Sequence, residues 1–299
     1  MANEKVKVKK KRKKWTGLEF FCTAGLTLLA LLIIIPFWNT IVISFSTNAA
    51  YVKSPFSLWP KEFTWDNYRN IFRNGDGLIT AYKNTIFVTL VGTLAAMATM
   101  IMAAYVFSRE FPGKRFLFLA AIFTMYFGGG LIPTYLLIKN LGLLNTHTSI
   151  ILMSLASVYN IIIMKNGFEG VPMDLQEAAM IDGANDLKIF AKVMLPLQKP
   201  LIATFSLFTA VGFWNNWYWP MLVLNKSDKT LLQLFLKTII ESASTLKEGV
   251  AAAEDLSTMI FTMGIQMASV LCVILPIMVV YPFLQKYFVK GMLVGSVKM

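Results

Sequence analysis

VPMDLQEAAMIDGANDLKIFAKVMLP, residues 171–196, is a polar interruption between two apolar segments of the chain. Its local signals predict two short helices joined by a turn. Pro172 can open the first helix, because the first turn does not need the missing N–H, and Gly183 can end it in the left-handed conformation. Asn185 or Asp186 can cap the second helix. That helix is expected to end at the last proline of the stretch and to carry an apolar stripe made of Leu187, Phe190, Val193 and Met194.

The composition indicates a membrane protein. Of the 299 residues, 56% are hydrophobic and 15% are charged, and the mean hydropathy is +0.60. A soluble domain usually has about a quarter charged residues. Runs of about 18 or more apolar residues are long enough to cross a bilayer. The sequence therefore predicts an all-α, polytopic membrane bundle of six transmembrane helices, at about 20–47, 84–108, 116–138, 149–164, 201–224 and 259–285.

The distribution of Lys and Arg predicts the orientation, because cytoplasmic flanks of membrane helices are enriched in them. With the N-terminus inside, the inner segments hold 18 of the 28 basic residues. Both termini are therefore expected in the cytoplasm, and the net charge of +12 is mainly a topology signal and not a sign of nucleic-acid binding. The basic run 9–14 is either an anchor of this kind or a patch for anionic lipid.

The predicted spans contain no Lys, Arg, Asp, Glu or His, apart from Glu19 at the inner edge of the first. Ion- and proton-driven carriers usually keep such a group within the membrane. The single histidine, His147, lies in a short outer loop, and the sequence has no phosphate-binding loop of the Gly-x-x-x-x-Gly-Lys-Ser/Thr type. Neither ATP hydrolysis nor ion coupling is therefore expected of this chain, so a partner that touches the inner face must supply the energy.

The polar stretch resembles the "EAA" coupling loop of permease subunits in binding-protein-dependent ABC importers. That loop has Glu-Ala-Ala, three residues, Gly, nine residues, a β-branched apolar residue, one residue and Leu-Pro. Where this chain has Val193, the family most often has isoleucine. The resemblance implies the type I permease fold of ABC importers, and it assigns ATPase coupling to Glu177, Ala178, Ala179, Asp182, Gly183, Leu195 and Pro196. An amphipathic loop lying on the membrane surface is the alternative from the pattern alone.

Other segments resemble the carbohydrate importers that handle complex oligosaccharides, namely 129–135, 141–146 and 287–298. The six-span plan is similar to the smaller permease of maltose-type systems. The resemblance implies a second, different permease, a cytoplasmic ATPase dimer that binds ATP and Mg²⁺, and a sugar-binding protein or lipoprotein outside. It implies no cofactor and no metal site in this chain, and no enzymatic activity. By the same resemblance, Glu177 pairs with a basic residue of the ATPase.

Two unusual stretches within the predicted spans are candidates for the sugar path. Three glycines and a proline in the third span should unwind or kink the helix. A broken helix within the membrane is tolerated where it lines a cavity. Aromatic rings with interleaved amides on the fifth span suit sugars, although an interfacial aromatic belt or helix–helix contacts explain them equally well. The candidates are Tyr126, Gly129, Asn160, Trp214, Asn215, Asn216, Trp217 and Tyr218.

The predicted organisation is a basic cytoplasmic tail (1–17), a permease domain (18–288) and a C-terminal cytoplasmic tail (289–299). Within the permease domain, the coupling loop is 167–200 and the outer loops are 48–83 and 225–258. The expected function is import of sugars into a bacterial cytoplasm by alternating access across the plasma membrane. A permease for amino acids or peptides, an ion-coupled carrier and a membrane anchor or assembly factor are the alternatives.

Overall fold

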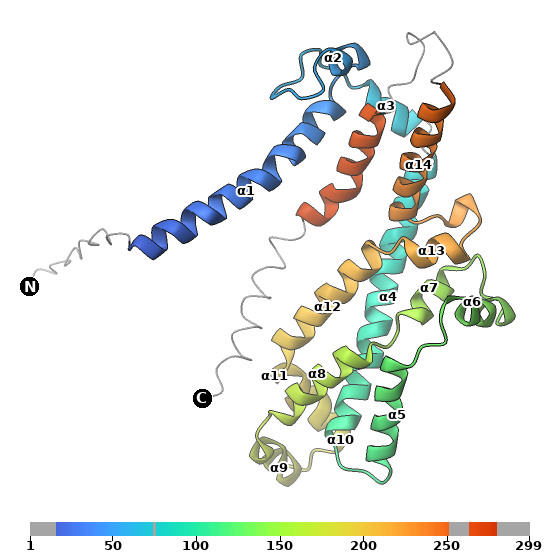
Figure 1. The fold of residues 1–299 in the computed structure, drawn as a ribbon. Helices are drawn as coiled ribbons and strands as arrows, with labels where there is room; N and C mark the ends of the chain where they lie inside the picture. Colours follow the sequence, from blue (N-terminus) through green and yellow to red (C-terminus); the bar gives the residue numbers. More distant parts are fainter. Residues whose placement is uncertain (1–15, 74–75, 251–262, 280–299) are drawn as a thin grey trace, which may run out of the picture.

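The computed structural model describes residues 16–73, 76–250 and 263–279, and every regular element that these residues form is a helix. Figure 1 shows the arrangement. The helices are α1 (Gly17–Ser44), α2 (Asn48–Lys53), α3 (Asp66–Arg73), α4 (Asp76–Ser108), α5 (Lys114–Tyr126), α6 (Leu131–Asn140), α7 (His147–Met153), α8 (Val158–Glu169), α9 (Met173–Ile181), α10 (Asp186–Ile189), the π-helix η1 (Phe190–Met194), α11 (Leu195–Leu197), α12 (Lys199–Trp214), α13 (Tyr218–Val223), the 3₁₀ turn η2 (Ser227–Lys229), α14 (Leu232–Val250) and the unlabelled helix Met263–Val279.

Two of these helices, α1 and α4, are long and apolar enough to cross a membrane by themselves. Three more spans result if each bent helix pair counts as one: α5 with α6, bent by 113°, α7 with α8, bent by 52°, and Asp186–Leu197 with α12, bent by 78°. The helix Met263–Val279 is apolar but shorter. An all-helical membrane architecture is thus present in the described residues, and the count of six spans stays a prediction.

Three predicted spans are interrupted, the first of them as expected and the other two against expectation. The span at 116–138 ends at Tyr126 and resumes at Leu131, so the expected interruption at the glycines is confirmed; Gly130 has φ +87°, which favours glycine. The span at 149–164 is divided between α7 and α8, because the Ser157 side chain caps a new helix. The span at 201–224 stops at Trp214 and continues only as the short α13.

Helix α4 is the central element of the fold, with α8 and α12 packed along it (Figure 1). Its contact surface is built largely from small and flexible side chains. Small residues allow the backbones of membrane helices to approach closely. The buried core along this axis joins α4 to α8 and α12 through Val88, Ala96, Met97, Met100, Ala104, Ile161, Met164, Phe168, Phe205 and Phe213.

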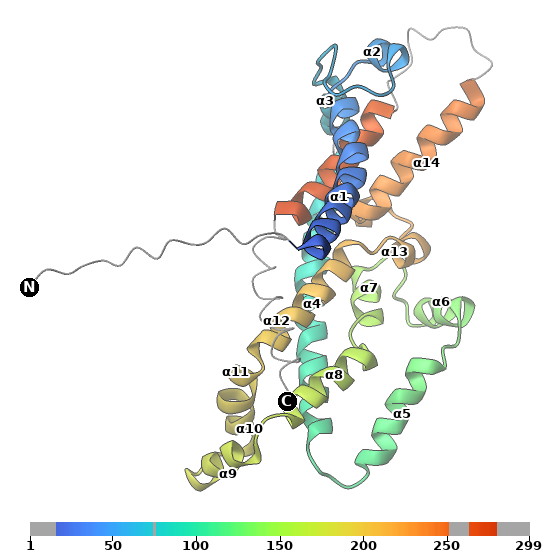
Figure 2. The same ribbon diagram turned by 60° about the vertical axis from the view of Figure 1, so that its left-hand side comes forward.

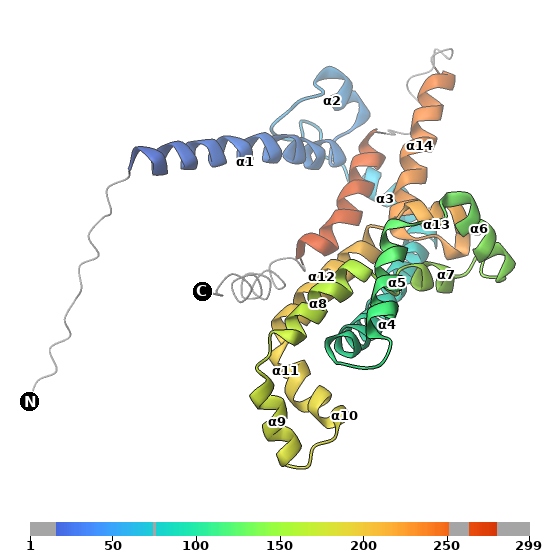
Figure 3. The same cartoon turned by 60° about the horizontal axis from the view of Figure 1, so that its bottom comes forward.

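Helix α1 stands away from the other helices along most of its length (Figures 1 and 3). Its apolar side chains are exposed from Leu18 to Ile35, and its buried residues are Val42, Ile43 and Ser44 at the far end. A helix that is apolar on all sides and satisfies its backbone hydrogen bonds internally is suited to a bilayer or to contact with another membrane helix.

The end of the molecule opposite α9 is capped by the segment between α1 and α4 (Figure 2). The rings of Phe45 and Phe63 stack with centroids 5.4 Å apart, and Trp65 meets Phe45 edge-on at 5.1 Å. The buried Asn67 side-chain amide donates to the backbone oxygens of Ser44 and Ser46, at 2.9 and 3.1 Å. Helix α3 is thereby fastened to the end of α1.

Two parts of the predicted outer loops are helical. Residues 76–83, within the predicted loop 48–83, form the first turns of α4. Within the predicted loop 225–258, a helix was expected at 231–240 and a turn at 247–249, but α14 runs on to Val250. The predicted tail 289–299 and nearly all of the tail 1–17 lie outside the described residues.

Two lysines join the beginning of α5 to the end of α8. The Lys165 ammonium lies 2.6 Å from the Glu169 carboxylate, and the Lys114 ammonium lies 2.8 Å from Glu110 and 3.8 Å from Glu169. Both lysine side chains are largely covered, so these pairs are less screened than free surface pairs. The cluster holds α8 in place immediately before the polar stretch begins.

A close contact at Gly167 fixes how α8 meets the beginning of α12. The Gln198 side chain donates to the Gly167 carbonyl at 2.7 Å. A Cβ at Gly167 would lie 2.5 Å from Leu201 Cδ2 and 2.9 Å from Gln198 Oε1. A side chain at this position would therefore displace the ends of Leu201 and Gln198, including the amide that bonds to α8.

We expect Gly167→Ala to lower the unfolding temperature of the purified protein in detergent, followed by tryptophan fluorescence. Overpacking costs about 1–3 kcal/mol, which exceeds the roughly 1 kcal/mol that alanine gains over glycine in a helix. Gly25→Ala is the matched control, since a Cβ there meets no atom within 4 Å. An equal gain in unfolding temperature for both variants would contradict this packing.

Candidate functional site

The polar stretch folds as the predicted helix–turn–helix, and we call α9, its turn and α10 the coupling hairpin. Helix α9 begins directly after Pro172 and ends at Ile181. Gly183 has φ +76°. The N–H of Ala184 donates to Ala179 O at 2.9 Å, and the N–H of Gly183 donates to Met180 O at 3.0 Å. These two bonds form a Schellman motif, which closes the turn.

The second arm of the hairpin is capped as the sequence predicts. The Asn185 side chain accepts a hydrogen bond from the Lys188 N–H at 2.9 Å. Helix α10 then widens into the π-helix η1 and continues through α11, one residue beyond Pro196. A proline removes the donor for the carbonyl four residues earlier, and the chain turns at Gln198 into α12.

The outward side of the hairpin mixes exposed apolar side chains with carboxylates. Ile181 is 87% exposed and Leu187 is 73% exposed. Glu177 lies on the same side of α9, and Asp182 and Ala178 are also exposed. Large apolar side chains that are exposed next to polar ones are typical of an interaction site. This hairpin face consists of Met173, Glu177, Met180, Ile181 and Leu187.

The opposite face of the hairpin is packed onto the bundle. The Gln176 side chain is buried, and Ala179, Phe190, Val193 and Leu195 pack against the main core. Ala179, one of the predicted coupling residues, is half-buried against the core. Leu187 was expected in one apolar stripe with Phe190, Val193 and Met194, and it is instead exposed.

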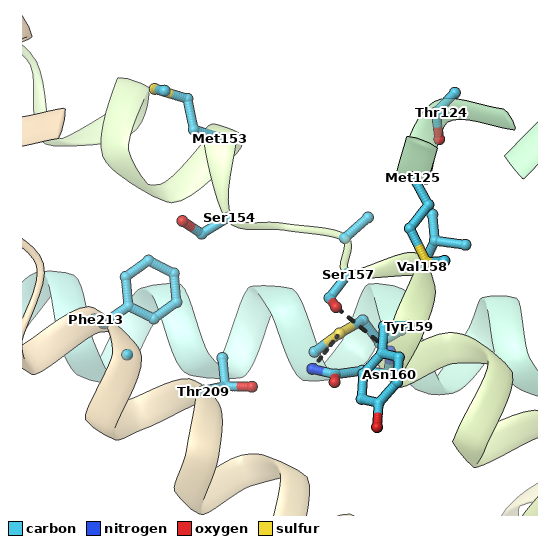
Figure 4. A pocket seen from close by; sticks show the side chains of 13 residues that line it. Thr124, Met125, Met153, Ser154, Ser157, Val158, Tyr159, Asn160, Thr209 and Phe213 are labelled. Atoms are coloured by element: carbon cyan, nitrogen blue, oxygen red, sulfur yellow. Dashed lines mark hydrogen bonds between the residues drawn. The ribbon is translucent and has the colours of Figure 1, made fainter. Parts of the chain in front are cut away.

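A cavity of about 550 Å³ lies beside the middle of α4, between α5, α7, α8 and α12 (Figure 4). Its walls carry hydroxyl, amide, thioether and ring groups but no charged side chain among the residues that line it. It is lined by Met100, Thr124, Met125, Met153, Ser154, Ala156, Ser157, Val158, Tyr159, Asn160, Thr209, Gly212 and Phe213.

Asn160 is the one predicted path residue that lines this cavity. Its side-chain nitrogen lies 3.8 Å from Met100 Sδ, and its backbone N–H donates to the Ser157 hydroxyl (Figure 4). The Thr209 hydroxyl lies 3.9 Å from Met97 Sδ. Because a thioether is a weak acceptor, these amide and hydroxyl groups can exchange their present partners for hydrogen bonds to a ligand.

The other predicted path residues lie outside this cavity. Trp214 faces a smaller apolar cavity of about 270 Å³ on the other side of α12, next to Pro276 and Ile277. Its neighbour Phe213 faces the large cavity, where its ring occupies the space above Gly92; a Cβ on that glycine would lie 2.7 Å from the ring. Successive helical residues are about 100° apart, which separates the two rings.

The aromatic–amide stretch after Trp214 is tied to α14 and does not face the cavity. The Asn215 side chain accepts from Gln233 at 3.2 Å, and the Lys237 ammonium lies 5.5 Å from the Trp217 ring centroid. The rings of Trp217 and Tyr218 meet edge-on. Asn216, Gly129 and Tyr126 do not line the cavity either. Tyr126 is 80% exposed and directly follows Thr124 and Met125, which do line it.

Sequence reasoning missed the hydroxyl groups of the cavity, of which Ser154, Ser157 and Thr209 are examples. The available signal was the pair of serines that interrupts the apolar run 149–164, since serine is typical of a helix N-cap. Among the described residues, no three His, Cys, Asp or Glu side chains lie close enough together to hold a metal ion.

Known proteins resemble the chain over nearly its whole length. The model of the family "Binding-protein-dependent transport system inner membrane component" matches residues 77–294. The polygalacturonan/rhamnogalacturonan transport system permease protein YtcP of Bacillus subtilis is 40% identical over 274 residues, covering 91% of this chain and 95% of the relative. Protein LplC of the same organism is 41% identical over 267 residues, 89% of each chain.

A solved structure has the same fold. It is the crystal structure of a bacterial ABC transporter involved in the import of the acidic polysaccharide alginate, with a TM-score of 0.82 and 31% identity, covering 93% of this chain and 100% of the other. This chain therefore belongs to the family of binding-protein-dependent transport system inner membrane components, which makes it a non-catalytic, multi-pass permease of an ABC transporter in the cytoplasmic membrane.

Proposed function

We propose that this chain is the permease subunit of an ATP-driven importer of oligosaccharides or polysaccharides, working by alternating access. Its relatives include a permease for polygalacturonan/rhamnogalacturonan transport and a transporter involved in alginate import. The cavity beside α4 supports a saccharide as cargo, because sugar hydroxyls can bond to Asn160, Thr209 and Ser157, and sugar C–H faces can meet the rings of Tyr159 and Phe213.

The observation that carries the proposal is the two-sided character of the coupling hairpin. Its inner face is packed onto the core through Gln176 and Ala179, whereas its outer face leaves Glu177 and Ile181 uncovered. Short helices of this length are marginal alone and become stable by docking. We assign the outer face to a cleft on a separate ATPase, in which Glu177 meets a basic residue.

The remaining parts of the transporter follow from this assignment. The hairpin faces the cytoplasm, both termini lie inside, and the chain crosses the membrane six times. The segment 48–73 and α14 then face outward, where a binding protein or lipoprotein delivers the sugar. A second, different permease completes the path. ATP and Mg²⁺ bind to the ATPase dimer, and this chain holds no cofactor.

We expect Glu177→Lys to weaken the hold on the ATPase by about thirtyfold or more, since breaking a buried charge pair at an interface costs about 2–5 kcal/mol. The measurement is the amount of ATPase that co-purifies with the permease from membranes containing equal permease. Glu62→Lys is the matched control: this exposed glutamate lies in the segment between α2 and α3, at the end of the molecule opposite α9, so ATPase retention should be unchanged.

The transport assignment is tested by reconstituting the co-purified complex and screening oligosaccharides for stimulation of ATP hydrolysis through the binding protein. Stimulation by saccharides, and not by amino acids or peptides, is the expected result. Accumulation of solute by the purified chain in vesicles that contain no ATPase would overturn the proposal.

A further inference from the structure

The end of α4 and the coupling hairpin are joined by one arginine. Arg109 follows α4 directly, and its Nη1 donates to the Gln176 side-chain oxygen, while its Nη2 donates to the Tyr105 hydroxyl at 2.6 Å. The Tyr105 hydroxyl donates in turn to the backbone oxygen of Asp186, at 3.4 Å. Gln176 belongs to α9 and Asp186 begins α10, so two residues at one end of α4 hold both arms of the hairpin.

This contact is not an ordinary surface ion pair. No carboxylate in the described part of the chain lies within 4.0 Å of the Arg109 guanidinium, whose Nε is buried without a partner. The Gln176 side chain is buried, and the guanidinium carbon lies 4.7 Å from the Tyr105 ring centroid. A cation held in this way orients planar partners through its fixed fork of donors.

The same tyrosine is packed between the neighbouring elements. The Tyr105 ring centroid lies 4.6 Å from that of Phe190, in η1, and 5.8 Å from that of Phe168, in α8. Five residues before Tyr105 on α4, about 7.5 Å along the helix axis, Met100 lines the central cavity. A single straight helix thus connects the contact at the hairpin with a wall of the cavity.

The covalent connections of the hairpin are less direct. Toward α8 the chain passes through Gly170, Val171 and Pro172, outside helix. Toward α12 it passes through the π-helix and the 78° bend at Gln198. Bends and irregular turns absorb displacement, whereas a packed helix transmits it as a rigid body.

We propose that Arg109, Tyr105 and Gln176 form a latch through which movement of the coupling hairpin is passed to α4 and so to the wall of the cavity. The three are positioning residues, which touch neither sugar nor nucleotide. The inference rests on the proposed docking of the hairpin face on the ATPase. Loss of the latch uncouples the cavity from ATP turnover, while the ATPase remains attached through Glu177.

The test uses the assembled transporter, purified with its second permease and ATPase and placed in nanodiscs. Cys22 and Cys272 are replaced by serine, and Thr209→Cys places a reporter thiol in the cavity wall. The probe is a bulky, water-soluble maleimide. Its labelling rate is compared between the nucleotide-free state and the state trapped with ATP and vanadate, with trapped nucleotide measured on the same sample.

With the latch intact, we expect the labelling rate to differ at least about fivefold between the two states, as a coupling of ordinary size gives. Gln176→Leu removes the acceptor, and Tyr105→Phe removes the hydroxyl but keeps the ring contacts; each should reduce the difference to less than about twofold. Gln176→Glu offers Arg109 a carboxylate as acceptor and should preserve the difference in labelling rate. Arg115→Gln, at an exposed arginine of α5, is the control.

A full difference in labelling for both Gln176→Leu and Tyr105→Phe, in complexes that trap nucleotide, would overturn the latch. Equal loss in Gln176→Glu and Gln176→Leu would also overturn it, because packing and not hydrogen bonding would then be the cause. If Gln176→Leu does not assemble, Tyr105→Phe decides. Glu177→Lys separates the two proposals. Retention of the ATPase by that variant refutes docking of the hairpin. If Glu177→Lys loses the ATPase as expected but the latch variants keep the full difference in labelling, only the latch is refuted.

Discussion

Replacing Gly212 with tryptophan is expected to abolish saccharide uptake while the transporter still assembles. Gly212 lies on the α12 wall of the cavity, and a Cβ there meets no atom within 4 Å. The indole therefore enters the space that we assign to the sugar. A sugar could then bind only by displacing the indole or the cavity wall. We take the cost as about 3 kcal/mol of binding free energy, the upper end for overpacking, which corresponds to a roughly hundredfold loss of uptake.

The fold should tolerate this change, because glycine is the poorest helix former apart from proline. The measurement is ATP-dependent uptake, into vesicles, of an oligosaccharide that stimulates ATP hydrolysis by the wild-type transporter. Gly212→Ala adds only a methyl group at the same position and should retain uptake. Equal transport by the tryptophan and alanine variants would show that the sugar does not pass through this cavity.

Gly183→Val is expected to separate the permease from its ATPase. Gly183 has φ +76°, and the left-handed conformation costs about 1–2 kcal/mol for a residue with a side chain, with branching at Cβ among the worst cases. The two hydrogen bonds that close the hairpin depend on this conformation. Because the hairpin helices are too short to be stable alone, we expect uptake to fall by about tenfold or more.

Asparagine adopts the left-handed region far more readily than other residues with a side chain, so Gly183→Asn is the matched control and should keep most of the activity. Both variants are compared for uptake and for the ATPase that co-purifies at equal permease content. Normal retention of the ATPase by Gly183→Val would mean that the hairpin does not need its turn in order to dock.

The hairpin was predictable because its signals are local. Pro172, Gly183 and Asn185 act on backbone atoms within a few residues of themselves, so their effects can be read from the order of residues alone. The same holds for the break in α5 and α6, where the glycines stand next to each other in the sequence. The family assignment also rests on this spacing, and the comparisons confirm it.

The cavity was predictable only in part, because its walls come from distant segments. Asn160 was expected, but Thr209 and Ser157 were not, since a hydroxyl in an apolar helix gives no periodic signal. Trp214 was expected in the path and lies on the other side of α12. Its direction is fixed by Phe213, whose ring fits against α4 only because position 92 has no side chain.

By itself, the sequence determined an apolar, all-helical permease with a helix–turn–helix between two apolar segments, because hydrophobicity, caps and turns act over a few residues. Only the tertiary structure decided which side chains meet. It brought Arg109 to Gln176, 67 positions apart, and Asn160 to Met100, 60 positions apart. Such contacts depend on how α4 packs against α8, α9 and α12, and packing between distant segments leaves no mark in the local order of residues.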